Sequence, residues 1–349
     1  MLTKFRSAAL AVTCLALQGC YVMQAARGQL QIVSAREPIT KVIEDPKEPG
    51  DLKQRLRTVQ EARAFASREL GLPNNKSYTS YADLRREYVV WNVVATPEFS
   101  VEPREWCFPV VGCVGYRGYF KEARAEEFAA KLRDEGLDAV VEGVPAYSTL
   151  GKFNDPILNT MMGYGDDELA TIMFHELSHQ LVYIPDDSSF NEAFAVTVER
   201  EGLSRWLAAH GRSADLKRHR ERRDRQADSI RIIARHRDRL SALYASGVAP
   251  EVMRQRKAEE FAALISDLKS LDARYGVKSR LVAELESAPP NNARLASLAT
   301  YYDCVPGFER VLGSVQHDLP RFYDEVRALA RLTRDQRHAQ LCASSPASE

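Results

Sequence analysis

The stretch LATIMFHELSHQLVYIPDDSSFNEAFAVTVEREG, residues 169–202, carries an H-E-x-x-H motif from His175 to His179 within a helical pattern of apolar residues. Residues four apart lie on one face of a helix, so both imidazoles can bind one metal ion while Glu176 lies beside it. A pair of surface histidines is the alternative interpretation. The flanks argue against it, because a helix that is apolar nearly all round is buried; these flanking residues are Leu169, Ile172, Met173, Phe174, Leu177, Leu181 and Val182. The sequence therefore predicts one Zn2+ ion held by His175 and His179.

The third ligand is expected on the next helix. Pro185 should end the first helix after Ile184, and the polar residues 186–189 should form a turn before a second helix begins near Phe190. Glu192, in the first turn of that helix, can complete a His2Glu site with one position open for water.

Two alternatives to Glu192 as the third ligand stay open on the residues alone. Ser189 and Glu192 also fit a capping box, in which the glutamate only bonds the backbone at the start of the helix. Glu199, two turns further along, is the rival ligand, and whichever glutamate is not bound is left to orient a histidine.

The metal motif resembles that of gluzincin aminopeptidases. HELSHQ at residues 175–180 and NEAFA at residues 191–195 are similar to the HELxHQ and NEGFA segments of those enzymes. There the glutamate of NEGFA is the third zinc ligand and another glutamate follows where this chain has Glu199, so the resemblance implies Glu192. The connection between His179 and Glu192 is shorter than in the common gluzincin families, which argues against membership in them.

The chain more closely resembles a bacterial family of predicted zinc aminopeptidases, formerly a domain of unknown function. The resemblance covers most of the mature chain and includes residues 106–113, residues 116–120, the metal core, and residues 291–293 with Tyr301 downstream. It implies a peptide substrate. The peptidase label of that family itself rests largely on the metal motif.

The composition is that of a globular protein with no global charge. Lys+Arg and Asp+Glu each total 48 in 349 residues, so nothing indicates nucleic acid as a partner.

Residues 1–19 are expected to be a lipoprotein signal peptide. Lys4 and Arg6 precede an apolar segment too short to span a bilayer, and Leu17-Gln18-Gly19-Cys20 resembles a lipobox. A lipid on Cys20 would anchor the protein to the bacterial cell envelope, and the absence of aspartate after Cys20 favours the periplasmic face of the outer membrane. A plain secretory signal is the alternative.

Four cysteines remain beyond Cys20, and an even number outside the cytoplasm indicates disulfides. They are Cys107, Cys113, Cys304 and Cys342, which allow three connectivities; Cys107–Cys113 would close a short loop and Cys304–Cys342 would tie down the C-terminal tail. A second zinc site is the alternative, but the spacing matches no usual one.

The predicted fold class is α+β and predominantly α-helical, with a zincin-like metallopeptidase core and a small sheet. An N-terminal α/β part is expected over residues 20–160, with strands at 88–96 and 139–141 around a helix at 121–135. Tyr147–Phe153 is the expected edge strand for substrate.

The segment from Cys107 to Phe120 is rich in glycine and aromatic residues. It could line a pocket or merely build a disulfide-bounded hairpin.

A helical zinc-binding part is expected over residues 161–349, interrupted by an antiparallel helical hairpin at 213–275. The first helix of the hairpin is dense in arginine. An ion-paired, solvated face explains this better than contact with anionic lipid, because acidic residues are interspersed.

The predicted chemistry is peptide hydrolysis with Glu176 as the general base. By resemblance to gluzincins, Tyr301 or Tyr302 is a candidate for stabilising the oxyanion, although two adjacent tyrosines on a helix more often serve core packing. The group that binds a substrate amine is not identifiable beyond Asp155 and Glu199. An endopeptidase and a non-catalytic, metal-stabilised envelope lipoprotein therefore stay open as alternatives.

Overall fold

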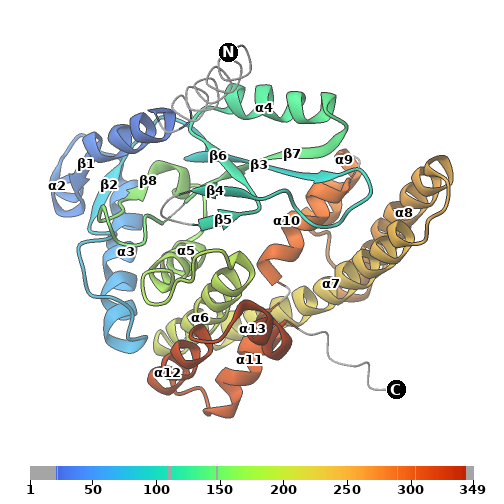
Figure 1. The fold of residues 1–349 in the computed structure, drawn as a ribbon. Coiled ribbons are helices and arrows are strands. Elements are labelled where there is room, and N and C mark those ends of the chain that lie inside the picture. Colours follow the sequence, from blue (N-terminus) through green and yellow to red (C-terminus); the bar gives the residue numbers. More distant parts are fainter. Residues whose placement is uncertain are drawn as a thin grey trace.

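The structure is a computed structural model that describes residues 21, 23–108, 112–146, 148–288, 290–302 and 304–342, with backbone only at 299–302. The segment 1–19, expected to be a signal peptide, and Cys20 lie outside these residues. The fold is predominantly helical α+β, which confirms the predicted class (Figure 1). The helices are α2 (Ile39–Glu44), α3 (Gly50–Glu69), α4 (Glu122–Asp134), α5 (Asp166–Ser178), α6 (Ser188–Ala209), α7 (Ser213–Ala245), α8 (Pro250–Tyr275), α9 (Arg280–Ser287), α10 (Asn292–Tyr302), α11 (Val305–Ser314), α12 (Leu319–Ala330) and α13 (Arg334–Leu341), with a short 3-10 helix at Asn159–Met161.

The largest sheet has the strand order β6-β3-β7 and is antiparallel. Its strands are β3 (Val90–Pro97), β6 (Arg117–Tyr119) and β7 (Leu137–Val144). Helix α4 covers one face and α10 the other (Figure 1). Side chains alternate along a strand, so Trp91 and Val93 pack towards α4, and Asn92, paired with Glu142, faces the opposite side. The two expected strands and the helix between them are confirmed.

The other strands are short. β1 (Arg36–Pro38), β2 (Ser80–Ala82) and β8 (Ile157–Leu158) form a second sheet, and β4 (Trp106–Phe108) and β5 (Gly112–Val114) form a hairpin. Both expected cysteine pairs are disulfides, Cys107–Cys113 across the hairpin and Cys304–Cys342 beside α13, so the alternative of a cysteine zinc site is not what the structure shows.

The expected edge strand over Tyr147–Phe153 is wrong for the residues described there. Residues 150–153 form a turn, residues 148–149 belong to no strand, and Tyr147 lies outside the described residues. Leu150, Gly151 and Asn154 have positive φ angles of 57°, 75° and 50°, which an extended strand cannot contain. The carboxylate of Asp155 holds the turn by accepting hydrogen bonds from the backbone N and Oγ1 of Thr149, at 2.9 and 2.6 Å.

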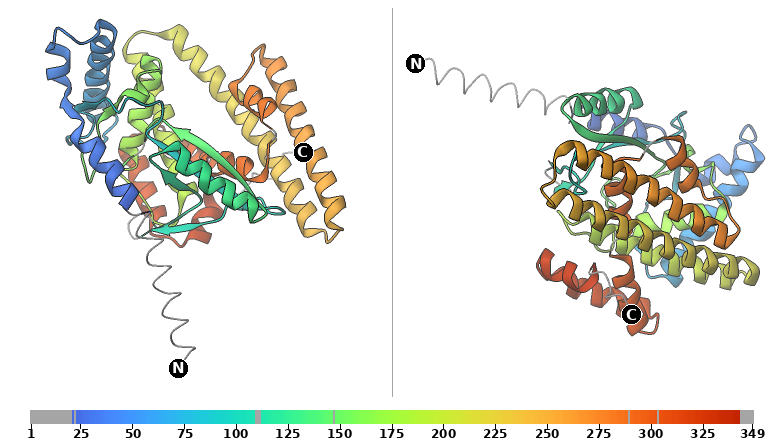
Figure 2. Two further views of the ribbon diagram at one scale, coloured as in Figure 1. Left: turned by 90° about the horizontal axis from the view of Figure 1, so that it is seen from above. Right: turned by 90° about the vertical axis from the view of Figure 1, so that its right-hand side faces the viewer.

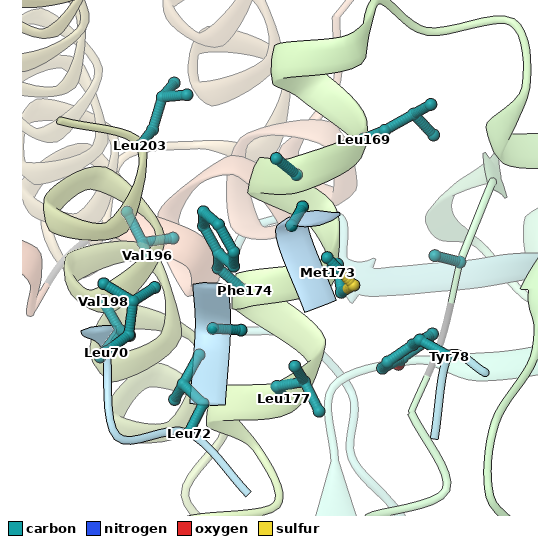
Figure 3. Close-up of a cluster of buried hydrophobic side chains, with 14 of the residues drawn as sticks. Leu70, Leu72, Tyr78, Leu169, Met173, Phe174, Leu177, Val196, Val198 and Leu203 are labelled. Carbon is teal, nitrogen blue, oxygen red and sulfur yellow. The ribbon is translucent and has the colours of Figure 1, made fainter. Parts of the chain in front are cut away.

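Helix α5 lies in the centre of the main core, as its apolar flanks predict. Met173, Phe174 and Leu177 are fully buried. Figure 3 shows them among Leu70 and Leu72, which follow α3, and Val196 and Val198 of α6. This packing fixes the position of His175, which directly follows Phe174.

Helix α5 ends at Ser178, earlier than the sequence predicts. The amides of Gln180 and Leu181 bond the carbonyls of Leu177 and Ser178, three residues back. Such bonds tighten the last turn of a helix. His179 is therefore the C-cap residue, so the chain leaves the helix immediately after the second histidine.

Helices α7 and α8 form the expected antiparallel hairpin along one flank of the molecule, seen in the right-hand view of Figure 2. Several of its basic residues are ion-paired with acidic ones, as in the pairs Arg218–Asp215, Arg223–Glu309 and Arg225–Asp272. These pairs favour the predicted solvated, ion-paired face. None of the helices in the described part of the chain is both long and apolar enough to cross a membrane.

Candidate metal centre

The structure brings the three expected ligands together. Nε2 of His175 and Nε2 of His179 lie 3.2 Å apart, one helical turn separating the residues on α5. The carboxylate of Glu192, on α6, lies 3.3 Å from Nε2 of His175 and 3.8 Å from Nε2 of His179. One donor atom from each residue lies within 4.8 Å of the others.

These separations suit a tetrahedral metal ion. Ligand bonds of about 2.0–2.1 Å place the corners of a tetrahedron about 3.3 Å apart. The three side chains are 15%, 9% and 18% exposed, so the cluster is largely buried and still accessible to solvent. Two imidazoles and a carboxylate are the donor set of catalytic zinc sites. The cluster is thus compatible with a metal ion.

Glu199 occupies a different place from Glu192. Its carboxylate lies 2.8 Å from Nδ1 of His175, on the far side of the ring from Nε2. A hydrogen bond there fixes the orientation of the ring. It also keeps the proton on Nδ1, so the lone pair of Nε2 is available to a metal ion, as in carboxylate–histidine–zinc arrangements. Nδ1 of His179 is buried with no hydrogen-bond partner within the described residues.

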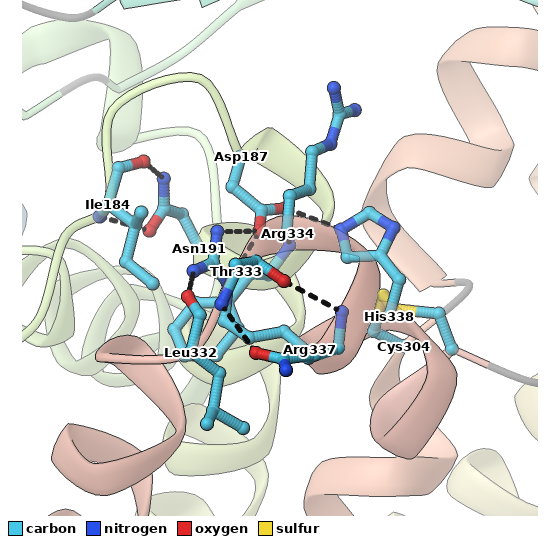
Figure 4. Close-up of polar contacts among 12 residues, drawn as sticks. Ile184, Asp187, Asn191, Cys304, Leu332, Thr333, Arg334, Arg337 and His338 are labelled. Carbon is cyan, nitrogen blue, oxygen red and sulfur yellow. Dashed lines mark hydrogen bonds and ion pairs between the residues drawn. A yellow bond between two sulfur atoms is a disulfide. The ribbon is translucent and has the colours of Figure 1, made fainter.

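The bend between α5 and α6 places Glu192. Asp187 is the N-cap of α6 and accepts a hydrogen bond from the backbone N of Phe190, so the capping box from Ser189 to Glu192 is wrong. The side-chain amide of Asn191 holds the backbone of Ile184 on the other side of the bend. Its Oδ1 accepts from the N of Ile184 at 2.8 Å and its Nδ2 donates to the O of Ile184 at 2.7 Å (Figure 4). Glu192 is therefore free to face the imidazoles.

The C-terminal helix also holds this bend. Asp187 is 1% exposed and accepts hydrogen bonds from Nη2 of Arg337 and from Nε2 of His338, both at 2.7 Å (Figure 4). On the other side, the amide of Cys113 in the β4–β5 hairpin donates to Asp186, whose φ is 67°. The turn between α5 and α6 is thus held by α13, by the β4–β5 hairpin and by Asn191 of α6 itself.

Glu176 lies beside the cluster and is 8% exposed. Burial raises the pKa of Glu176 to about 7; His175 opposes the rise, and the negative charges of Glu192, Asp155 and Glu199 add to it. Burial, together with the positive charge of His175, lowers the pKa of His179 to about 4, although Glu192 opposes this. A carboxyl group that titrates near neutrality suits a general base.

Tyr116 is a neighbour of the cluster that the motifs did not single out. Burial raises the pKa of Tyr116, and the charges of Glu192 and Glu176 add to the rise, so its hydroxyl stays protonated. Tyr116 and Gly115 also line a cavity that Glu192 borders. The glycine-rich segment after the Cys107–Cys113 hairpin therefore does line a pocket. The side chains of Tyr301 and Tyr302 lie outside the described residues.

A family profile described as "Putative aminopeptidase" matches residues 20–341. The chain belongs to this family. No curated protein and no solved structure matches the chain with significance. Membership in the Aminopep family supports peptidase activity on peptide substrates, in agreement with the donor set of the candidate metal centre.

Proposed function

We propose that the protein is a zinc-dependent peptide hydrolase with a zincin-like core, acting as an aminopeptidase. The observation that carries this proposal is the approach of His175, His179 and Glu192 to one another at the separations of a tetrahedral site. A bound zinc ion supplies Lewis acidity and brings the pKa of a bound water towards neutrality.

The residues around the cluster divide the remaining work. Glu176 takes the proton from the attacking water and passes it to the leaving amine. Glu199 holds the ring of His175 through Nδ1. Tyr116, protonated and bordering the same cavity as Glu192, donates a hydrogen bond to the oxygen on which charge develops.

The proposal extends to the location of the protein. Gly19-Cys20 after a short apolar segment supports a lipid anchor on Cys20 in the bacterial envelope. The two disulfides are in keeping with an oxidising compartment. Mass spectrometry of the protein purified from bacterial membranes tests this; an unacylated N-terminus would contradict it.

The function is tested by comparing the wild type with Glu176→Gln on a fluorogenic aminoacyl amide, with zinc content measured on both proteins. We expect Glu176→Gln to keep one zinc per chain and to lose about 10²- to 10⁴-fold in kcat. Asp166→Asn, which removes an exposed carboxylate from the same helix, is the matched control and should retain activity. Undiminished turnover in Glu176→Gln would refute the assigned role.

A further inference from the structure

A small cavity lies beside Glu192, between the β6-β3-β7 sheet, α6 and α10. Its volume is about 20 Å³. It is lined by Asn92, Val94, Gly115, Tyr116, Glu142, Ser188, Glu192 and Ser297. A larger hollow of about 780 Å³ lies between α3 and residues 74–79, but none of the three candidate metal ligands lines it. Of these two cavities, the small one is therefore the one beside the candidate metal centre.

The pairing of β3 with β7 builds the polar wall of this cavity. Asn92 is directly opposite Glu142 in the antiparallel register, and both are on the sheet face away from α4. Glu142 and Glu192 contribute two carboxylates, and no Lys or Arg is among the described residues that line the cavity. The lining is therefore rich in acceptor oxygens, which suit a small group that donates several hydrogen bonds.

Glu142 is held in place and still has acceptor capacity. One oxygen accepts from Nη1 of Arg294 and the other from Oγ of Ser297, at 2.6 Å, both from α10. A carboxylate offers about four lone-pair sites, so each oxygen can accept another hydrogen bond. Arg294 also bonds Glu284, which Arg280 bonds in turn at 2.6 Å, so the two glutamates and two arginines of this group balance in charge and Glu142 acts as a hydrogen-bond acceptor. The Glu142 side chain is 21% exposed, which leaves it accessible to a ligand.

We propose that this cavity binds the α-ammonium group of the first residue of a peptide, with Glu142 as its principal acceptor. This inference rests on the proposed function and deepens it. A cavity of about 20 Å³ holds a group of roughly the size of one water molecule, which an ammonium group matches. It cannot hold a continuing peptide chain or an acetyl cap. The cavity therefore makes the enzyme an exopeptidase that requires a free N-terminus.

The test compares two substrates on three zinc-loaded proteins. The substrates are a fluorogenic leucyl amide and its N-acetylated form, and the proteins are the wild type, Glu142→Gln and Asp138→Asn. Asp138 is the matched control, because it lies on the same face of β7 and bonds the backbone N of Asn292 at the start of α10, yet does not line the cavity. It controls for general loosening between the sheet and α10.

We expect the wild type to prefer the free amine strongly. Glu142→Gln should lower kcat/KM for the free amine by about 10- to 100-fold, through KM, since a hydrogen bond to a charged group contributes about 1.5–3 kcal/mol. Asp138→Asn should keep the preference. Asn92 lies opposite Glu142 in the cavity lining. Asn92→Leu, which puts an apolar side chain of similar shape in its place, should also weaken the preference for the free amine.

A second readout separates binding from turnover. In the Glu176→Gln background, calorimetric titration with leucine amide and with N-acetyl-leucine amide should show a difference in affinity that Glu142→Gln removes. Equal hydrolysis of both substrates by the wild type would overturn the amine site while leaving the zinc hydrolase intact. Equal losses in Glu142→Gln and Asp138→Asn would also overturn it. If neither substrate is hydrolysed, the proposed function itself fails and this inference falls with it.

Discussion

The carboxylate of Asp187 lies 2.7 Å from Nη2 of Arg337, and both side chains are buried although 150 positions separate them in the chain. Asp187 begins helix α6, which carries Glu192, and Arg337 lies on α13. The pair therefore connects the candidate metal centre to the last helix. Breaking a buried pair leaves an uncompensated charge, which is strongly destabilising.

Arg337→Met should lower the free energy of unfolding by about 1.5–3 kcal/mol, because the buried carboxylate of Asp187 would lose its charged guanidinium partner and keep only His338 and the backbone N of Phe190. Urea denaturation followed by circular dichroism measures this. Arg334→Met is the matched control on the same helix, since Arg334 is 52% exposed and its nearest acidic partner lies 3.9 Å away. An equal decrease in the free energy of unfolding in the two variants would contradict a stabilising role of the Asp187–Arg337 pair.

The stability contributed by Asp187 should depend on pH in the acid range. Burial opposes ionisation, but hydrogen bonds from His338 and Arg337 outweigh it and hold the pKa of Asp187 below its usual range. A carboxyl group with a lowered folded pKa stabilises the protein above its unfolded pKa, and this stabilisation is lost as pH falls through the folded value. The difference in unfolding free energy between the wild type and Asp187→Asn should therefore shrink between about pH 5 and pH 2. A difference that stays constant over this range would exclude Asp187 as the titrating group.

Glu199→Gln should weaken zinc binding by about 10- to 100-fold without unfolding the protein, because the ring of His175 loses its charged partner at Nδ1. Competition with a chromogenic chelator measures the affinity. Glu201→Gln, on the same helix but bonded to Arg205 and His317, should leave zinc affinity unchanged. Unaltered affinity in Glu199→Gln would show that Glu199 does not orient the ligand.

Tyr116→Phe should lower kcat by about 10²- to 10³-fold with little change in KM, because the hydroxyl acts on charge that develops only in the transition state. Steady-state kinetics on the leucyl amide provides both constants. Tyr119→Phe is the control, since Tyr119 packs among the hydrophobic side chains between the sheet and α4. A rise in KM at constant kcat would instead assign Tyr116 to substrate binding.

Local patterns predicted much of the fold. The helices of the α7–α8 hairpin, the strands β3 and β7, and the buried character of α5 follow from apolar periodicity within each segment. The H-E-x-x-H spacing and the NEAFA segment likewise predicted that His175, His179 and Glu192 lie together. A helix fixes the relation between the two histidines, because residues four apart lie on one face.

Features that depend on distant contacts could not be predicted. The bend between α5 and α6 is contacted by Arg337 at Asp187 and by the hairpin amide of Cys113 at Asp186, partners 150 and 73 positions away in the chain. The turn at residues 150–153 depends on a local contact instead, the carboxylate of Asp155 with Thr149, which the extended pattern of the segment did not reveal. The cavity at Glu142 arises only from strand register and from α10, which no spacing in the sequence encodes.

In the proposed enzyme, His175, His179 and Glu192 hold one zinc ion that serves hydrolysis. Diffraction from zinc-loaded crystals at the zinc absorption edge tests it most directly. We predict one anomalous peak at about 2.0–2.2 Å from Nε2 of both histidines and from the Glu192 carboxylate, with Glu199 retained at Nδ1 of His175. A peptide-hydrolysing protein whose zinc is bound elsewhere, or is bound by Glu199 in place of Glu192, would contradict the account.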